Sequence, residues 1–461
     1  DVLDENVTKA YCIHSQNNTR LEYETKCGLK IKRTIFLLPQ YDNLPVATEV
    51  QRIEITNTAN KKRNLKIVAT GMFGAALPHA LMEDVVYSTV IMQSKVLADE
   101  EGNMLAYIPS YYPEEAKANV RFTTLVGYKS GSKKYAHELC TQYTEFVGSG
   151  TLQRPQGLAK LSNRLSTKGP GFFALGLNVS LDANETSYAD TFTGLVSVFE
   201  NTAVPEDLVW EQISSLHKKF DTVEEVNKSF ARNSESYAKY CSYLQIETED
   251  KKFDTYVNKN LPFQVLYQTF VSRSFDLTQK GYREIGFREI QDIFVSLYYL
   301  VSMGKADFTK SLLKEWISKV FDFGYVYHNF FWQGKEAGKW SDDGLWLLQA
   351  VYRYISYTGE VEFLDECYPV AGEENKTRSV YDTLKAIINY SGEISIGEHN
   401  MPLIDFADWN DCLQIDTDYL TGPEKEKLYK QGASAKEIRN GGSESVMNAF
   451  LLKLAIDHMI S

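Results

Sequence analysis

The stretch "PEDLVWEQISSLHKKF", residues 205–220, marks the point at which the periodicity of the sequence changes. Its apolar residues recur every three to four positions, which is typical of an amphipathic helix. Before it, "LKIKRTIFLLP" (29–39) and "VQRIEITN" (50–57) alternate apolar and polar residues, the pattern of strands with one buried face. After it, "VEEVNKSFARNSESYAKYC" (223–241) continues the helical period. The sequence therefore predicts two halves of different architecture.

The two halves suggest a multidomain chain that contains both α and β structure. Short strands separated by turn sequences predict an antiparallel β-sandwich over residues 1–203, and residues 204–251 are expected to form a helical linker. From residue 252, helices alternate with long aromatic loops, a pattern that suits an (α/α) toroid with a cavity lined by its loops. The expected helices lie near residues 254–276, 287–303, 306–320, 343–357, 379–391 and 444–460. They amount to about half of a twelve-helix barrel, so we expect either a partial chain or association with the missing barrel half.

Composition excludes several classes of function. The chain has 461 residues and a formal net charge of −12, which argues against nucleic acid and anionic membranes as partners. It contains no run of about 18 apolar residues, the length that spans a bilayer. Its six cysteines are scattered without a CxxC pair. This usage is typical of reduced thiols and predicts a cytoplasmic protein.

Two loops carry charged residues that could bind a ligand. In "GYREIGFREIQD" (281–292), Arg288 and Asp292 would lie one helical turn apart on one face. A surface ion pair at a helix start explains the same residues. In "GKWSDDGLWLL" (338–348), Asp342 and Asp343 follow a serine, which also fits a helix N-cap with acids that complement the helix dipole. Neither loop identifies a site by itself.

The stretch "IDFADWNDCLQIDTD" (404–418) is more informative. Five aspartates in fifteen positions favour a turn, because Asp side chains bond to nearby backbone groups. A calcium loop would need glycine at its sixth position, where this stretch has Leu413, and we expect no metal. A disordered loop would not be as apolar as the residues that precede Trp409. The remaining interpretation is a semi-buried turn that presents Trp409 beside Asp411. Such a pair suits a sugar, since the ring covers its apolar face and the acid protonates the glycosidic oxygen.

The order of four motifs carries a family resemblance. "GFREIQD", "SDDGLWLLQAVYRYISYTGEVEFLDE", "MPLIDFADWNDCL" and "GGSESVMNAFLL" follow one another along the chain. They resemble the inverting phosphorylases of glycoside hydrolase family 94, which include cellobiose, chitobiose and 1,2-β-oligoglucan phosphorylases. The resemblance implies a β-sandwich, a helical linker and an (α/α)6 barrel of which about half is present. It also implies inorganic phosphate as co-substrate and no other cofactor.

The resemblance implies roles for individual residues. Asp411 falls on the general acid, and Trp409 lines the sugar subsite. Arg288 and Asp292 would hold the donor sugar, although "FREIQD" is one residue shorter than the usual family motif, so that Arg283 is an alternative. Burial and a neighbouring carboxylate would raise the pKa of Asp411 and keep it protonated near neutral pH. The full set expected to bind substrate is Arg288, Asp292, Asp342, Asp343, Asp408, Trp409 and Glu444.

Three functional hypotheses follow. The first is inverting phosphorolysis of β-linked glucooligosaccharides to α-glucose 1-phosphate. Residues 267–300 look most like the 1,2-β-oligoglucan enzymes, with cellobionic acid or cellobiose phosphorylase as the alternative. The second is an inverting hydrolase, which needs a second carboxylate as base. Glu444, Asp342 and Asp343 are candidates for that base. The third is a non-catalytic glycan-binding protein, in which loss of Asp411 would be expected. A homodimer is compatible with all three.

Overall fold

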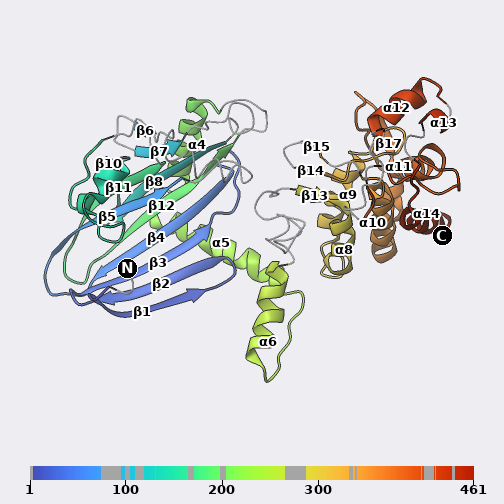
Figure 1. Ribbon diagram of the computed structural model, residues 1–461. Helices are drawn as coiled ribbons and strands as arrows, with labels where there is room; N and C mark the ends of the chain where they lie inside the picture. Colours follow the sequence, from blue (N-terminus) through green and yellow to red (C-terminus); the bar gives the residue numbers. More distant parts are fainter. Residues whose placement is uncertain are drawn as a thin grey trace. The chain divides into compact units, whose positions relative to one another are not determined.

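The computed structural model describes most of the chain and divides it into two compact units, Asp1–Ser242 and Tyr243–Ser461. These are called the sheet unit and the helical unit (Figure 1). The described residues are 4–73, 95–98, 104–108, 119–129, 131–164, 171–197, 204–264, 287–331, 336–337, 340–405, 407–409, 420, 422–433, 435–438 and 442–461.

A large antiparallel sheet forms the centre of the sheet unit (Figure 1). Nine strands belong to it among the described residues, and eight of them form one continuous path. In spatial order this path is β1 (Val7–His14), β2 (Asn18–Thr25), β3 (Leu29–Leu37), β4 (Ala47–Asn57), β12 (Thr186–Ser197), β8 (Asn119–Lys129), β7 (Met104–Ile108) and β6 (Lys95–Ala98). The ninth strand, β9 (Ser132–Tyr135), pairs with β8.

A smaller sheet covers one face of the large one. It consists of β10 (Glu138–Cys140), β11 (Phe172–Leu181) and β5 (Arg63–Met72), and its described pairs are antiparallel. Alternate residues of β11, such as Leu175 and Leu177, point into a shared core with Ile55 and Leu125 of the large sheet. Burial of each such side chain is worth roughly 1.5–3 kcal/mol. The predicted antiparallel sandwich is therefore confirmed.

Helices cover the opposite face of the large sheet. Ile213 of α4 (Glu206–Lys219) and Val226 of α5 (Val223–Cys241) lie with Phe122 and Phe192 of the sheet in a second buried core, which also contains Phe220 between the two helices. α5 begins after Thr222, whose side chain accepts a hydrogen bond from the backbone of Glu225. This cap satisfies one of the unpaired N–H groups at the helix start. Two short helical segments, α3 (Tyr143–Val147) and a 3₁₀ turn (Gln156–Leu158), lie instead beside the smaller sheet, where α3 contacts β10 and β11.

A buried ion pair fastens α5 to the sheet. Arg52 on β4 donates from Nε and Nη2 to the carboxylate of Asp190 on β12, at 2.7 and 2.6 Å. Its Nη1 donates to the carbonyl oxygen of Val223, at 3.1 Å, and to the side chain of Asn227. Arg52 is 6% exposed and Asp190 is not exposed at all. One guanidinium therefore joins two strands and a helix.

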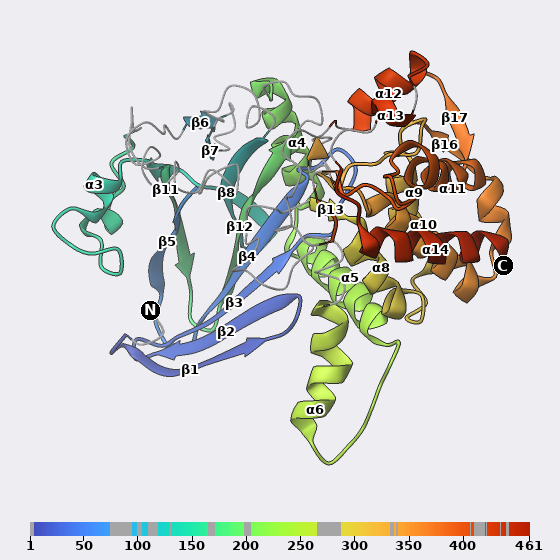
Figure 2. The same ribbon diagram turned by 45° about the vertical axis from the view of Figure 1, so that its right-hand side comes forward.

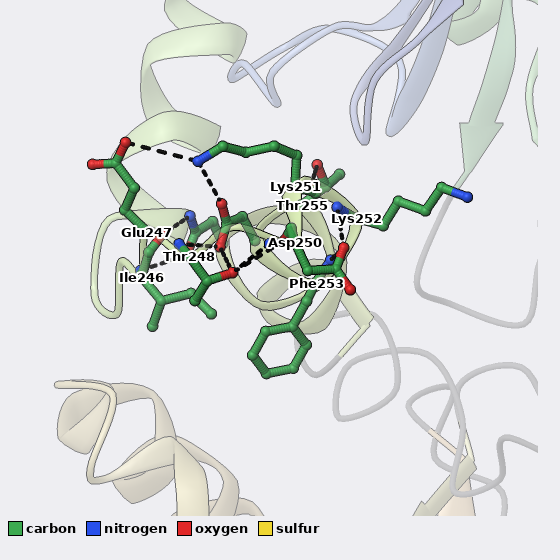
Figure 3. Close-up of polar contacts among 10 residues, drawn as sticks. Ile246, Glu247, Thr248, Asp250, Lys251, Lys252, Phe253 and Thr255 are labelled. Carbon is green, nitrogen blue, oxygen red and sulfur yellow. Dashed lines mark hydrogen bonds and ion pairs between the residues drawn. The ribbon is translucent and has the colours of Figure 1, made fainter.

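The helical unit begins with a capped helix that Figure 3 shows in detail. Asp250 accepts from the backbone N–H groups of Lys252 and Phe253, at 2.9 and 3.1 Å. Thr248 donates through its hydroxyl to Asp254, which also pairs with Lys251 at 3.1 Å. The helix, α6 (Lys251–Thr255), continues into a π-helical turn (Tyr256–Asn260). The negative charges near its start complement the helix dipole.

The helices α12 and α13 pack against the π-helical turn that follows α11, and α8, α9, α11 and α14 pack around α10 (Figure 2). Their buried core contains Trp316, Leu348, Tyr354 and Leu384. The helices are α8 (Ile290–Leu300), α9 (Ala306–Ile317), α10 (Asp343–Thr358), α11 (Val380–Asn389), α12 (Gly422–Lys430), α13 (Ala435–Ile438) and α14 (Val446–Ile460). A 3₁₀ turn (Val361–Asp365) follows α10 and a π-helical turn (Tyr390–Ile394) follows α11. The short strands are β13 (Phe287–Glu289), β14 (Asn329–Phe331), β15 (Glu336–Ala337), β16 (Cys367–Pro369) and β17 (Thr377–Ser379).

Most of the expected helices are confirmed, and one prediction is wrong in a way that matters for the site. The helix expected near residues 287–303 begins only at Ile290, because Phe287–Glu289 pair as a strand with Asn329–Phe331. Arg288 and Asp292 therefore do not share one helical face. The expected helix near residues 254–276 is described only as far as residue 264.

α14 has apolar residues on all sides. Leu451 and Ala455 are buried against the helical core, while Phe450 is 66% and Ile460 is 80% exposed. A helix that is apolar all round is normally buried on every face.

Among the described residues, no helix is long and apolar enough to cross a membrane.

Candidate active site

The two adjacent acids predicted from the sequence lie at the start of α10. Asp342 is the N-cap residue and Asp343 is the first residue of the helix. They are 3% and 1% exposed. The N-terminal end of a helix favours negative charge, which offsets part of the cost of burying two acids together. Oδ2 of Asp342 accepts a hydrogen bond from Nε1 of Trp346 at 2.8 Å.

Burial gives Asp342 a pKa unlike that of a surface carboxyl group. Loss of solvent raises the pKa of Asp342 well above its usual value, and the charge of Asp343 raises it further. The hydrogen bond from Trp346 and the nearby His328 act in the opposite direction but are smaller. Asp342 is therefore suited to hold a proton and donate it in a hydrogen bond.

A histidine that sequence reasoning missed is paired with Asp343. Nδ1 of His328 lies 3.1 Å from both carboxylate oxygens of Asp343. Its ring packs against Trp340, with the ring centres 4.3 Å apart. An ionised carboxylate can only accept hydrogen bonds, so this contact places the imidazole proton on Nδ1. The only sequence signal was a histidine in the aromatic run "YVYHNFF" (325–331).

The segment called here the acid loop, residues 402–405 and 407–409, is fastened to the start of α10. The Ser341 hydroxyl donates to the carbonyl oxygens of Ile404 and Ala407, at 2.9 and 3.1 Å. The Ser341 N–H donates to Ala407 as well, and Trp340 forms an isolated parallel bridge with that residue. Ser341 was expected as the N-cap of α10. That prediction is wrong, because Asp342 occupies the cap position and the serine binds the loop instead.

The acid loop is also fastened to the start of α14. Ser445 is the N-cap of this helix and donates its hydroxyl to Oδ2 of Asp408 at 2.6 Å. The same hydroxyl accepts from the backbone of Asn448, whose side-chain amide donates to Ser341 at 2.8 Å. The chain Asp408–Ser445–Asn448–Ser341 is entirely buried. It joins two helix starts and the loop into one polar network.

The next residue, Trp409, is not part of this network and points outward. The residue is 61% exposed, whereas the adjacent Asp408 is 6% exposed. An exposed indole next to a buried, hydrogen-bonded carboxylate is well placed to form a stacking surface. Asn410 and Asp411 lie outside the described residues.

Both carboxylate oxygens of Glu444 accept hydrogen bonds from a neighbouring turn. It accepts from the backbone and from Nδ1 of His399, at 2.8 and 2.6 Å. Burial raises its pKa, but hydrogen bonds from His399 and the backbone of Met401 outweigh that effect and lower it. A side chain at Gly397 would approach Glu444 to 2.0 Å, so this position requires glycine. Glu444 therefore orders residues 397–401.

The backbones of the other predicted residues lie in the same unit. Arg288 pairs across the sheet with Phe330, two positions after His328. Asp292 lies in the first turn of α8, which packs against α10 in the same core. The side chains of Arg288 and Asp292 lie outside the described residues. The structure thus places Asp342, Asp343 and Asp408 at two helix starts.

One other cluster of acids could hold a cation by geometry, among the residues that the structure describes. It comprises Asp322, Glu373 and Glu426, whose oxygens lie within 4.8 Å of one another. Lys430 contacts both glutamates, at 2.6 and 3.0 Å, and Lys376 contacts Asp322 at 2.7 Å. Together with Arg378, 3.8 Å from Asp322, these lysines balance the three acids, so the cluster is best described as an ion-pair network.

Comparison with known proteins identifies the class. Residues 3–222 match the supersandwich domain of glycosyl hydrolase 94, and residues 237–461 match the catalytic domain of the glycosyl hydrolase 94 superfamily. Together these two matches cover almost the whole chain. The chain therefore belongs to the glycosyl hydrolase 94 family.

Three curated relatives are similar to this chain. Cyclic beta-(1,2)-glucan synthase NdvB of Rhizobium meliloti is 26% identical over 58% of this chain and 10% of its own length. N,N'-diacetylchitobiose phosphorylase of Vibrio proteolyticus is 24% identical over 43% of this chain and 28% of its own length. Solabiose phosphorylase of Paenibacillus borealis is 24% identical over 44% of this chain and 24% of its own length. The chain thus spans less than a third of each relative.

Proposed function

We propose that this chain forms part of an inverting glycoside phosphorylase that cleaves β-linked glucooligosaccharides with inorganic phosphate. The observation that carries the proposal is the acid loop, which is held at two helix starts and presents Trp409 to solvent beside the buried Asp408. Asp411, two positions further along the chain, would be the general acid. Two of the curated relatives are phosphorylases, which supports the same reaction class.

The described carboxylates favour a phosphorylase over a hydrolase. An inverting hydrolase needs a second carboxylate that is free to activate water. Glu444 is committed to His399 and residue 401, Asp343 is paired with His328, and burial beside Asp343 favours the protonated form of Asp342, which cannot accept a proton from water. Phosphate is already an anionic nucleophile and needs no such base. In this proposal Asp342 and Asp343 bind the hydroxyl groups of the sugar.

The proposed substrate is an oligomer of β-1,2-linked glucose. The resemblance of residues 267–300 to 1,2-β-oligoglucan phosphorylases supports this linkage, as does similarity to a protein named as a cyclic β-1,2-glucan synthase. Cellobiose and cellobionic acid remain the alternative substrates. We also propose that α8 to α14 belong to an (α/α)6 barrel and that Arg288 and Asp292 hold the donor sugar.

The products distinguish the reaction classes. The full-length protein is incubated with β-1,2-glucan oligomers, with and without millimolar phosphate, and followed by ³¹P and ¹H NMR. We expect α-glucose 1-phosphate only when phosphate is present, because attack from the opposite face inverts the β-anomer. Free glucose in phosphate-free buffer, or a β-phosphate product, would contradict the proposal. Cellobiose, cellobionic acid and chitobiose in parallel reactions test the choice of substrate.

A further inference from the structure

A lysine is completely buried next to the acid loop. Lys425 on α12 is 0% exposed. Its ammonium group donates to the Ser395 hydroxyl at 2.9 Å and to Oδ1 of Asp405 in the acid loop. The other oxygen of Asp405 accepts from the Tyr390 hydroxyl at 2.8 Å. Tyr390, Ser395 and Asp405 are each less than 5% exposed, so the whole group is shielded from water.

The backbone around this group is unusual at two points. Asp405 has a φ of 54°, in the left-handed region that residues other than glycine rarely adopt. Tyr390 begins a π-helical turn (Tyr390–Ile394), and this turn ends just before Ser395. The extra residue of a π-helical turn displaces the side chains that follow it, and such turns often occur at functional sites. Both irregularities bring their side chains to Lys425.

A buried ion pair is a poor device for stability alone. Removing two charges from water costs so much that apolar residues of similar size often stabilise a protein equally well. Its better-attested use is to select one conformation among several. Here the pair fixes Asp405 in a strained conformation, three residues before Asp408 and four before Trp409.

The Ser341 hydroxyl couples the two parts of the acid loop. Ser341 binds the carbonyl oxygens of Ile404 and Ala407, and Ser445 binds Asp408. With Lys425 on Asp405, the described loop is fixed on both sides of residue 406. A shift of Asp405 would therefore be transmitted to the orientation of Asp408 and Trp409.

We propose that Lys425 is a positioning residue for the acid loop, with Tyr390 and Ser395 as its supports. This inference rests on the proposed function, since the loop it positions would grip the sugar. Lys425 does not act on the substrate. It sets the orientation in which Trp409 meets the sugar. A misplacement of about 1 Å can cost a catalytic site about 10²-fold in rate.

The contacts of Lys425 and Tyr390 with Asp405 are called the anchor. The test compares variants that weaken this anchor to different degrees. Lys425→Met removes the charge but keeps the length of the side chain, and Tyr390→Phe removes only the hydrogen bond to Asp405. Lys310→Met is the matched control, since Lys310 bridges Glu360 and Glu366 elsewhere in the same unit and is also mostly buried. Each variant of the full-length protein is assayed for kcat, for KM and for thermal midpoint.

Hydrogen exchange supplies a readout that does not depend on activity. Leu403 donates its N–H to Ser395, and Ile404 donates its N–H to Ser443. We expect Lys425→Met to increase amide exchange at residues 403–404 about tenfold or more and to lower kcat about 100-fold. For Tyr390→Phe, a mild variant that should fold even if Lys425→Met does not, we expect smaller changes in the same two quantities. The control should lower the thermal midpoint and leave both quantities unchanged.

The outcomes separate this inference from the proposed function. If the wild-type protein phosphorolyses no β-glucan but residues 403–404 respond as expected, the proposed function fails and the anchor stands. The anchor is refuted if exchange at residues 403–404 does not change in either anchor variant. It is also refuted as a positioning device if kcat of an active enzyme falls no further in these variants than in Lys310→Met.

Discussion

Replacement of Asp342 by Asn should make the helical unit more stable at neutral pH. The amide keeps an oxygen that can accept the hydrogen bond from Trp346, but it cannot ionise. In the native protein, burial and the charge of Asp343 raise the pKa of Asp342 well above its usual value, against a smaller opposite effect of His328. In the unfolded chain an Asp has a pKa near 3.9. The substitution thus removes a group that folds more readily when protonated.

The sign and size of the effect follow from proton linkage. Below about pH 4, Asp342 is protonated in both states and imposes no penalty. As the pH rises towards the native pKa, only the unfolded chain releases the proton, so the wild-type protein loses stability. One proton corresponds to a slope of at most about 1.4 kcal/mol per pH unit. The variant should lack this slope, and its advantage over the wild type should grow as the pH rises above about 4, until the pH reaches the native pKa of Asp342.

The assay is urea unfolding at several pH values between 4 and 7.5. Tryptophan fluorescence reports mainly on the helical unit, since five of the six tryptophans follow residue 243 in the sequence. Asp307→Asn serves as the control, because Asp307 is exposed on the first turn of α9. Superimposable pH profiles for Asp342→Asn and the wild type would refute the reasoning. If Asp342 binds sugar as proposed, the stabilised variant should also show a higher KM.

Three further predictions concern other parts of the chain. Arg52→Met should destabilise the sheet unit by about 3–5 kcal/mol in urea unfolding, because it leaves the buried Asp190 without its partner; an unchanged midpoint would contradict this. Hydrogen bonds, led by that of Lys310, lower the pKa of Glu366 to about 2, so its contribution is present above about pH 4.5 and is lost as the pH falls towards 2. Glu366→Gln should therefore cost about 1 kcal/mol or less at pH 7, since the group is partly exposed, and nothing at pH 2; a cost that is constant with pH would exclude the ion pair as its source. The exposed ring of Phe450 on α14 should promote self-association of polypeptide 1–461, and Phe450→Ser should reduce it in light scattering, whereas equal association of both proteins would place the contact elsewhere.

Periodicity was enough to predict an antiparallel sheet domain followed by a helical one. Alternation in the first half indicated strands, and the change of period near residue 205 coincides with the start of α4 at Glu206. The helical pattern also located α9, α10, α11 and α14 closely. It failed at Phe287–Glu289, where pairing with a strand some forty residues away overrides the local helical pattern. The residues next to Phe287–Glu289 in the sequence do not indicate that a distant strand will pair with them.

The candidate site was predicted only in part, for the same reason. Asp342 and Asp343 could be singled out as two adjacent acids before a helix, and Asp408 and Trp409 because they lie in a stretch rich in aspartate. Lys425 could not, since it lies in "PEKEKLYK" (423–430), which reads as an ordinary solvated helix. Its burial depends on Asp405 and Ser395, residues distant in the sequence.

The most direct test of the account is the replacement of Asp411 by Asn in the full-length protein. Loss of the proton donor should slow phosphorolysis of a β-1,2-glucan oligomer about 10²–10⁴-fold. An aryl β-glucoside with an acidic phenol as leaving group needs little protonation and should lose much less activity. Asp418→Asn, a change in the same acidic stretch, is the control and should retain wild-type rates. Near-normal phosphorolysis of the oligomer by Asp411→Asn would show that another group supplies the proton and would contradict the central claim.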